Sequence, residues 1–453
     1  MSADWPLIPL GELVDFKTGK LDSNASVEGG KYPFFTCSPT TLAIDTYAFD
    51  VEAVLLAGNN ANGIFPVKYH KGRFNAYQRT YVVTPKDPES LSVKWLYFRT
   101  KHVTAELQQM SVGSATKFLT KKILDAYKIP LPPIDVQRYQ AGILWSIQDK
   151  IQLNHQINQT LEQMAQAIFK SWFVDFEPVK AKIAALEAGG SAADAELAAM
   201  RAISGRFLPD ADASAAGADP LAQMALEQPE QYAELQATAA LFPAAMQASE
   251  LGEVPEGWEV GKLKDVAKYP NDRVCTEELS LDTYVSTECM VENKKGVSQA
   301  SSLPSAATVP SFKENQILVS NIRPYFKKIW LAHYSGGRSP DVLCFESTED
   351  QGHGFLFNVL YQDCFFDYMM RTSKGAKMPR GDKKAVMEFG LTVPPSELIS
   401  LYSQSVSGYY QLAANKKAEN ESLASLRDTL LPKLLSGELT LPEAEAPLLE
   451  AAQ

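Results

Sequence analysis

Apolar side chains recur at helical spacing over residues 135–180, which predicts the longest element of the chain. The steps between successive apolar positions are mostly three and four residues, so the side chains fall along one stripe of a single helix. Pro132 and Pro133 come directly before this stretch, where proline is compatible with the start of a helix. The stripe comprises Ile143, Ile147, Ile151, Ile157, Leu161, Met164, Ile168 and Trp172.

A helix of this length, roughly 60 Å, needs a second helix to cover its apolar stripe. One long helix packed in an ordinary globular core is the alternative. Residues 396–440 carry a similar pattern, and a shift of 262 positions aligns residues 132 and 133 with Pro394 and Pro395. We therefore predict a coiled coil between two helices of one chain, paired through Ile147, Ile151, Leu161, Met164, Ile168, Tyr409, Leu423, Leu426 and Leu430.

The same shift relates more than the two helices, since Gly113 aligns with Gly375. A repeat whose period is about half the chain is much longer than a solenoid unit and indicates two similar halves. We accordingly predict two globular domains of mixed α/β structure, residues 1–134 and 257–395, each followed by one of the long helices.

The acidic side chains are concentrated outside these two domains. The chain has a formal net charge of −11, which taken alone disfavours a nucleic-acid partner. Residues 181–256 are rich in alanine and hold 3 basic and 12 acidic side chains, a composition typical of a partly helical, partly flexible linker. Residues 1–134 instead carry 15 basic and 12 acidic side chains, so net charge does not exclude nucleic-acid binding by the domains. Residues 441–453 are predicted to form a flexible tail.

Residues 58–83 of the first domain are rich in glycine and asparagine, which predicts turns and loops. They combine basic, amide and aromatic side chains, the groups that contact phosphates and base edges in nucleic-acid complexes. A solvated hairpin is the alternative for this stretch. The candidate nucleic-acid-binding residues here are Lys68, Tyr69, Lys71, Arg73, Gln78 and Arg79.

Polar stretches of a similar kind occur in the second domain. Residues 373–386 form a basic loop with glycines that aligns with residues 112–124, which contain Lys117. Equivalent basic loops in both halves suggest a shared role in clamping a phosphate backbone. The remaining candidate residues are Arg323, Tyr325, Lys327, Lys328, Arg338, Lys374, Lys377 and Arg380.

The sequence contains no recognisable catalytic, cofactor-binding or metal-binding signature. It lacks a Walker A phosphate loop and the Asn/Asp-Pro-Pro-aromatic motif that an amino-methyltransferase needs around its target base. The five histidines show no ligand spacing with cysteines or carboxylates. The five cysteines form no CxxC pair, and no apolar run reaches about 18 residues. We therefore predict a cytoplasmic protein with reduced thiols and no membrane partner.

Five motifs, in this order and partly duplicated, resemble the specificity subunit of Type I restriction–modification systems. The resemblance covers nearly the whole chain, although each motif alone is weakly specific. The motifs are WxxxxLGEL at residues 5–13, PLPPIxxQ at 130–137, LEQMAQAIFKSWFVDFEPV at 161–179, GEVPEGWEV at 252–260 and LLPKLLSGEL at 430–439.

This resemblance implies a mixed α/β fold with two target-recognition domains and two long helices that pair antiparallel within the chain, as a pseudo-twofold repeat. It implies that each domain reads one half of a bipartite target in double-stranded DNA, while the helices set the spacing. Catalysis would belong to partners: two methyltransferase (modification) subunits that bind S-adenosylmethionine, and restriction subunits that use ATP and Mg²⁺. The alternatives are a fused DNA methyltransferase or nuclease with an unrecognised active site, and a coiled-coil scaffold that does not bind DNA.

Overall fold

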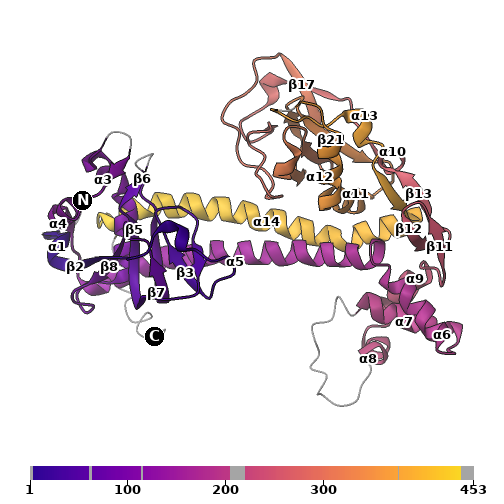
Figure 1. Ribbon diagram of the computed structural model, residues 1–453, viewed down its shortest axis with the longest axis horizontal. Coiled ribbons are helices and arrows are strands. Elements are labelled where there is room, and N and C mark those ends of the chain that lie inside the picture. The colour runs from indigo at the N-terminus through magenta and orange to yellow at the C-terminus, as the bar shows by residue number, and fades with distance from the viewer. Residues whose placement is uncertain (1–3, 61–63, 114–115, 205–219, 376, 440–453) are drawn as a thin grey trace. The chain divides into compact units, whose positions relative to one another are not determined.

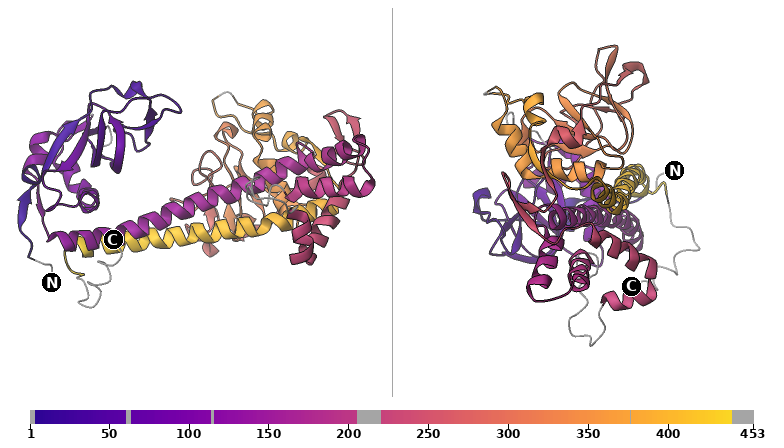
Figure 2. Two further views of the ribbon diagram at one scale, coloured as in Figure 1. Left: turned by 90° about the horizontal axis from the view of Figure 1, so that it is seen from below. Right: turned by 90° about the vertical axis from the view of Figure 1, so that its right-hand side faces the viewer.

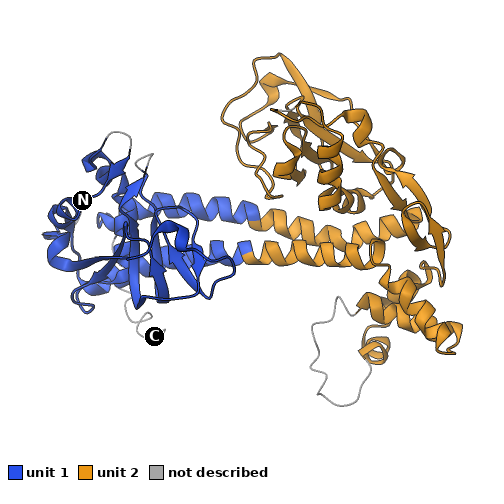
Figure 3. Cartoon of the chain, viewed as in Figure 1, with its two compact units in different colours: residues 1–155, 417–453 blue, residues 156–416 orange. Residues whose placement is uncertain are grey.

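The computed structural model describes residues 4–60, 64–113, 116–204, 220–375 and 377–439. It divides into two compact units (Figure 3), the first made of Met1–His155 with Lys417–Gln453 and the second of Gln156–Lys416. Each unit contains one globular part of mixed helices and strands and a segment of each long helix. The predicted tail, residues 441–453, lies outside the described residues.

A six-stranded sheet forms the framework of the first unit (Figure 1). Its central strand, β5, is apolar on both faces. Val54 and Leu56 point into one hydrophobic core and Ala53 and Leu55 into another, because successive side chains of a strand point to opposite faces. Among the paired strands, only β3 and β7 are parallel. The order across the sheet is β2 (Val14–Thr18), β8 (Thr80–Pro85), β5 (Phe49–Ala57), β7 (Val67–Ala76), β3 (Tyr32–Phe35) and β4 (Leu42–Ile44).

Two helices cover one face of this sheet. Trp95 of α2 (Val93–His102) and Leu107 of α3 (Thr104–Met110) share a buried cluster with Val54 and Leu56 of β5. The Ser92 hydroxyl caps α2 by accepting a hydrogen bond from the Trp95 backbone N–H. The smaller elements are α1 (Leu10–Leu13), η1 (Ser23–Ala25), α4 (Lys121–Ala126), and the strand pairs β1 (Leu7–Pro9) with β10 (Lys128–Pro130) and β6 (Asn59–Asn60) with β9 (Lys117–Phe118).

Two four-stranded sheets form the globular part of the second unit. Ile317 and Val319 of β18 face a core shared with helices that include α11 and α12, whereas Leu318 faces a core shared with the other sheet. One sheet has the order β14 (Ala267–Lys268), β21 (Val342–Ser347), β18 (Ile317–Ser320), β19 (Ile329–Leu331), and the other β15 (Arg273–Cys275), β17 (Thr308–Phe312), β20 (Gly336–Arg338), β16 (Tyr284–Val285). The helices are α10 (Leu263–Val266), η2 (Thr276–Glu278), η3 (Pro324–Phe326), α11 (His353–Tyr361), α12 (Asp363–Arg371) and α13 (Lys383–Val386).

Both units enter their long helix in the same way. In the first unit β1 pairs with β10, which leads into α5 (Ile134–Phe173). In the second, β13 (Glu259–Lys262) pairs with β22 (Gly390–Val393), which leads into α14 (Ser396–Leu435). Each long helix has 40 residues, and the differences 396 − 134 and 435 − 173 are both 262. The mixed α/β fold with two repeated halves, predicted from the sequence, is thereby confirmed.

Helices α5 and α14 lie side by side in each unit (Figures 1 and 2). Their interhelical hydrogen bonds join rising residue numbers in α5 to falling numbers in α14, so the helices run antiparallel, as predicted. These bonds are Gln140 to Leu434 and Asn154 to Asn420 in the first unit, and Asn158 to Ala413 and Ala165 to Tyr402 in the second.

A polar contact interrupts the apolar stripe in the first unit. Asn154 is fully buried, and its Nδ2 donates to Asn420 Oδ1 at 2.9 Å and to Glu419 Oε2 at 3.1 Å. Asn420 Nδ2 donates in turn to the Ile151 carbonyl at 3.3 Å, and Lys150 Nζ lies 3.5 Å from the Glu419 carboxylate. A buried amide pair favours one register of the two helices, because sliding would leave the amides without partners.

The residues predicted to pair the helices differ in burial. Ile151, Leu161 and Ile168 are buried, and the half-buried ones are Ile147, Met164, Tyr409, Leu423 and Leu430. Leu426 is 48% exposed, so its assignment to the stripe was wrong. Arg427 takes the inward position instead, and its Nη1 donates to Gln148 Oε1 at 3.0 Å.

The alanine-rich stretch, predicted to be partly helical and partly flexible, is helical and folded into the second unit over most of its described residues, and residues 205–219 lie outside them. The ring of Trp172, at the end of α5, lies 5.5 Å from the ring of Phe242, and Ala199 and Ala239 are fully buried in the same core. Alanines are small enough to let helices approach closely, so this composition indicated packed helices. The elements are α6 (Glu177–Glu187), α7 (Ala192–Ser204), α8 (Pro220–Glu227), α9 (Pro229–Ala240), β11 (Met246–Ser249) and β12 (Gly252–Pro255).

Aspartate at a buried stripe position is expected to destabilise the protein. Leu161 is 9% exposed, so Leu161→Asp would place an unpaired carboxylate inside the helix pair, at a cost of at least about 3 kcal/mol. Leu426→Asp is the matched control and should change the free energy of unfolding by less than about 0.5 kcal/mol. Thermal unfolding followed by circular dichroism compares the two. Equal Tm values for both variants would refute the assigned stripe.

Candidate nucleic-acid interface

Residues 67–76 form strand β7 and β8 begins at Thr80, which corrects the prediction of turns and loops for this stretch. Lys68 and Tyr69, both on β7, are engaged in internal contacts. The Lys68 amine is buried without a hydrogen-bond partner among the described residues and lies 5.7 Å from the centre of the Phe35 ring. Desolvation lowers the pKa of Lys68. The Tyr69 hydroxyl donates to Glu52 at 2.7 Å, and its ring lies 4.5 Å from that of Trp145. Burial and the Glu52 carboxylate raise the pKa of Tyr69. Both side chains therefore contribute to packing of the first unit.

Lys71 and Arg73, further along β7, face carboxylates on the neighbouring strand β5. Lys71 Nζ lies 3.7 Å from Glu52, and Arg73 Nε donates to Asp50 at 3.1 Å. The Lys71 and Arg73 side chains are 74% and 55% exposed, so these ion pairs contribute little stability. The two carboxylates nevertheless neutralise the positive charge of Lys71 and Arg73, so β7 attracts phosphates only weakly.

The turn between β7 and β8 presents Gln78 and Arg79 without carboxylate partners. Both are exposed, and neither side chain makes a hydrogen bond or ion pair among the described residues. The Arg79 guanidinium lies 5.5 Å from the centre of the Phe118 ring, which places the turn against β9. Lys117, on β9, is half-buried and is likewise without an ion pair within the described part of the chain. The structure therefore brings the turn with Gln78 and Arg79 against strand β9, on which Lys117 is the residue next to Phe118.

The turn η3 carries the candidate residues of the second unit. Arg323 and Lys327 flank it in left-handed conformations, each with φ of 50°, and Tyr325 at its apex is 48% exposed. Lys327 Nζ forms an ion pair of 3.0 Å with a carboxylate at the start of α12, and Lys328 Nζ donates to a backbone carbonyl at 2.9 Å. The two lysines thus hold the turn, and Arg323 and Tyr325 are the residues that it presents.

The predicted basic loop lies beside this turn. Ile322 forms a strand-like bridge with Arg380, and the Arg323 backbone N–H donates to the Pro379 carbonyl at 2.8 Å. The loop is closed by a bridge between residues 374 and 380, and the corresponding loop of the first unit by one between residues 112 and 118. These bridges differ by 262 residues at both ends, so the predicted loop equivalence holds in backbone geometry. Gly113 and Gly375 have φ of 109° and 97°, a region that glycine enters without strain.

Within this loop the basic side chains differ in their partners. Lys374 forms an ion pair with Asp382 at 2.5 Å, and Arg380 forms one with Asp341 at 3.2 Å. Lys377 is exposed and makes no hydrogen bond or ion pair among the described residues. Lys377 is therefore the loop cation most available to an external anion.

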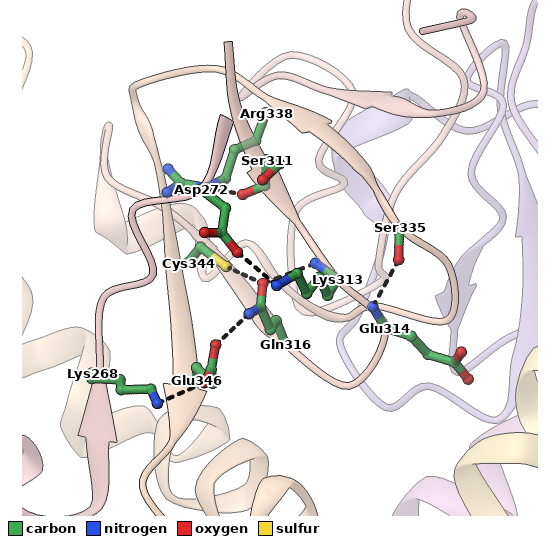
Figure 4. Close-up of polar contacts among 10 residues, drawn as sticks. All are labelled: Lys268, Asp272, Ser311, Lys313, Glu314, Gln316, Ser335, Arg338, Cys344 and Glu346. Carbon is green, nitrogen blue, oxygen red and sulfur yellow. Dashed lines mark hydrogen bonds and ion pairs between the residues drawn. The ribbon is translucent and has the colours of Figure 1, made fainter. Parts of the chain in front are cut away.

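Arg338 does not belong to a surface, which corrects its prediction as a DNA-binding residue. It is 7% exposed, and its guanidinium donates to the Ser311 carbonyl at 3.2 Å (Figure 4). It also donates to the Val342 carbonyl at 2.7 Å. The sequence around it resembles an exposed turn, but Arg338 ends strand β20 and its side chain turns inward. Next to it, Cys344 donates to Gln316, which donates to Glu346. Burial raises the pKa of the Cys344 thiol to about 12. This region is a structural network of hydrogen bonds.

Three polar residues beside η3, Asn321, Lys294 and Asp363, were not predicted from the sequence. Asn321 is 6% exposed, and its Oδ1 has no hydrogen-bond partner among the described residues. Lys294 and Asp363 form an ion pair of 2.7 Å. The turn-forming stretch VENKKG at residues 291–296 was the available signal for Lys294. No local pattern pointed to Asp363, because its role comes from a contact with Lys294, 69 positions away.

Among the described residues, no group of three or more His, Cys, Asp or Glu side chains is arranged to hold a metal ion. Within the same residues, no helix combines the length and apolar character needed to cross a membrane.

Comparison with known proteins identifies the family. Residues 2–163 match the Type I restriction modification DNA specificity domain. The chain is 30% identical over 341 residues to the Type I restriction enzyme HindI specificity subunit of Haemophilus influenzae, which covers 71% of each protein. It is 26% identical over 465 residues to the EcoDI specificity subunit of Escherichia coli, across 97% of this chain and 90% of that protein.

A solved structure shares the fold. The crystal structure of the Type I restriction–modification S subunit from M. genitalium matches with a TM-score of 0.57 at 15% identity, across 95% of this chain and 96% of that one. The names of these relatives give no support to a fused enzyme or a scaffold without DNA. The chain belongs to the family of Type I restriction–modification specificity subunits and is a DNA sequence-specificity subunit of such a system.

Proposed function

We propose that each globular part reads one half of a bipartite sequence in double-stranded DNA, and that α5 and α14 set the spacing between the halves. This proposal rests on the polar side chains that each unit presents near its sheets without hydrogen bonds or ion pairs among the described residues. These are Gln78, Arg79 and Lys117 in the first unit and Tyr325 and Lys377 in the second. Unpaired groups of these types are suited to phosphate and base-edge contacts.

The proposal assigns catalysis to partner chains. Two methyltransferase subunits would dock on the specificity subunit, bind S-adenosylmethionine and methylate adenine, and restriction subunits would use ATP and Mg²⁺ to translocate and cleave DNA. The family of specificity subunits supports this division. A cytoplasmic location, predicted from the cysteine pattern, belongs to the same proposal.

Arg79→Ala is expected to weaken binding to the target duplex by about 1–3 kcal/mol and to relax one base position, with Tm unchanged because Arg79 is exposed. Arg338→Ala should instead lower Tm, because the carbonyls of Ser311 and Val342 lose their donors. Methylome sequencing of cells that carry the partner subunits identifies the target, and fluorescence anisotropy measures binding. Equal weakening on target and unrelated duplexes would reassign Arg79 to a phosphate contact.

Lengthening the helix pair is expected to lengthen the unread spacer of the target. Four residues add about 6 Å to a helix, or one to two base pairs at roughly 3.4 Å each, and nearly preserve the apolar stripe. The insertion follows Asn154 in α5, with a matched insertion in α14 to maintain pairing. Two-residue insertions are the control, because they rotate the stripe by about 200° and should disrupt pairing. An active four-residue variant that methylates the original spacing would rule out helix length as the determinant.

A further inference from the structure

Unfavourable backbone conformations are concentrated around η3. Asn293, Lys294, Arg323 and Lys327 have φ of 56°, 63°, 50° and 50°. These are four of the seven non-glycine residues with positive φ in the described part of the chain. Lysine and arginine are disfavoured in this region, so such conformations persist only where surrounding contacts hold them, and they are frequent at binding sites.

Backbone hydrogen bonds lock the two strained segments together. The Asn293 N–H donates to the Phe326 carbonyl, and the Lys294 N–H donates to the Lys327 carbonyl, both at 2.9 Å. The Lys328 amine fixes the end of the turn through its hydrogen bond to a backbone carbonyl. The 323–327 turn therefore depends on the conformation of the neighbouring segment at residues 293–294.

One carboxylate connects both segments to a helix. Asp363, the first residue of α12, has Oδ1 2.7 Å from Lys294 Nζ and 3.0 Å from Lys327 Nζ. The Lys294 and Lys327 side chains are 16% and 31% exposed, whereas the Asp363 side chain is 62% exposed. The two ion pairs therefore add little energy by themselves, and their effect on the turn is to fix where the two lysines lie. Lys294 Nζ also lies 4.4 Å from the centre of the Tyr361 ring. The hydrogen bonds from Lys294 and Lys327 hold the pKa of Asp363 below its ordinary value.

Two side chains of the turn make no hydrogen bond or ion pair among the described residues, although Arg323 is half-buried. The Tyr325 ring is packed 4.6 Å from that of Phe326, which limits its orientations, yet the residue is 48% exposed. Arg323 Nε is buried without a hydrogen-bond partner among the described residues. An oriented aromatic ring and a guanidinium on the same turn are suited to stacking on a base and donating to its edge.

We propose that Asp363 is a positioning residue for DNA recognition: by holding Lys294 and Lys327 together, it fixes the turn from which Tyr325 and Arg323 contact the bases of one half-site. This inference rests on the proposed function. Without the carboxylate, two ammonium groups would face each other unpaired, and the left-handed residues would lose the contact that holds them.

The change in DNA affinity when the Asp363 carboxylate is removed has opposite signs for a positioning role and for electrostatic repulsion alone. A carboxylate near DNA repels phosphates, so its removal alone should strengthen binding. If Asp363 positions the turn, Asp363→Asn should weaken binding instead. Asp367→Asn is the matched control, since Asp367 is exposed on the same helix, loses the same charge and makes no hydrogen bond or ion pair among the described residues.

The experiment uses the full-length chain and three synthetic duplexes: the sequence methylated in cells carrying the wild-type gene, and two versions with one half-site scrambled. For Asp363→Asn we expect about tenfold weaker binding to the methylated sequence and loss of discrimination at one half-site, with discrimination at the other retained. Tyr325→Ala, which alters only the presented ring, should lose the same half-site. Asp363→Glu should recover part of the affinity, and Asp367→Asn should bind at least as tightly as wild type.

Several results would overturn the inference. Binding by Asp363→Asn that equals that of Asp367→Asn would remove the positioning role, and so would equal loss at both half-sites together with a lowered Tm. Loss of different half-sites in Asp363→Asn and Tyr325→Ala would separate the carboxylate from the turn. A wild-type chain that fails to distinguish the three duplexes would overturn the proposed function as well, whereas the other failures leave that function intact.

Discussion

Two helices of 40 residues that each carry an apolar stripe require mutual cover in water, and the rest of the structure depends on this pairing. Because the partner of α5 is the last long element of the chain, the chain must return along its own first helix. Leu435, at the end of α14, is consequently fully buried in the core of the first unit together with Trp95 and Leu10. The first unit is thus built from both ends of the sequence, and neither end can complete its core alone.

Repeated and periodic features were the most predictable from the sequence. The shift of 262, read from a few matched residues, reappears in the bounds of both long helices and in the loop bridges at residues 112–118 and 374–380. Periodicity predicts such features because backbone hydrogen bonding and burial of one face act over many residues at once, so single exceptions do not hide the pattern.

Roles that depend on where one side chain points were not predictable. Arg338 and Arg79 both stand near turn-like sequence, yet one is 7% exposed and the other lies on the surface. Leu426 and Arg427 are adjacent, and the helix places the charged residue inward because Gln148 accepts its hydrogen bond. Cross-strand carboxylates such as Asp50 and Glu52 likewise decide which cations are neutralised. These outcomes arise from partners distant in sequence, which composition and spacing do not encode.

The buried contact between Asn154 and Asn420 has an evolutionary consequence. Displacing α14 by one turn would bring Lys416 or Ala424 to the position of Asn420, so the Asn154 amide would lose its partner inside an apolar seam. Small slips are therefore disfavoured even where the neighbouring leucines would tolerate them. A change in helix length that keeps the amide pair must therefore add or remove about one turn on both helices together.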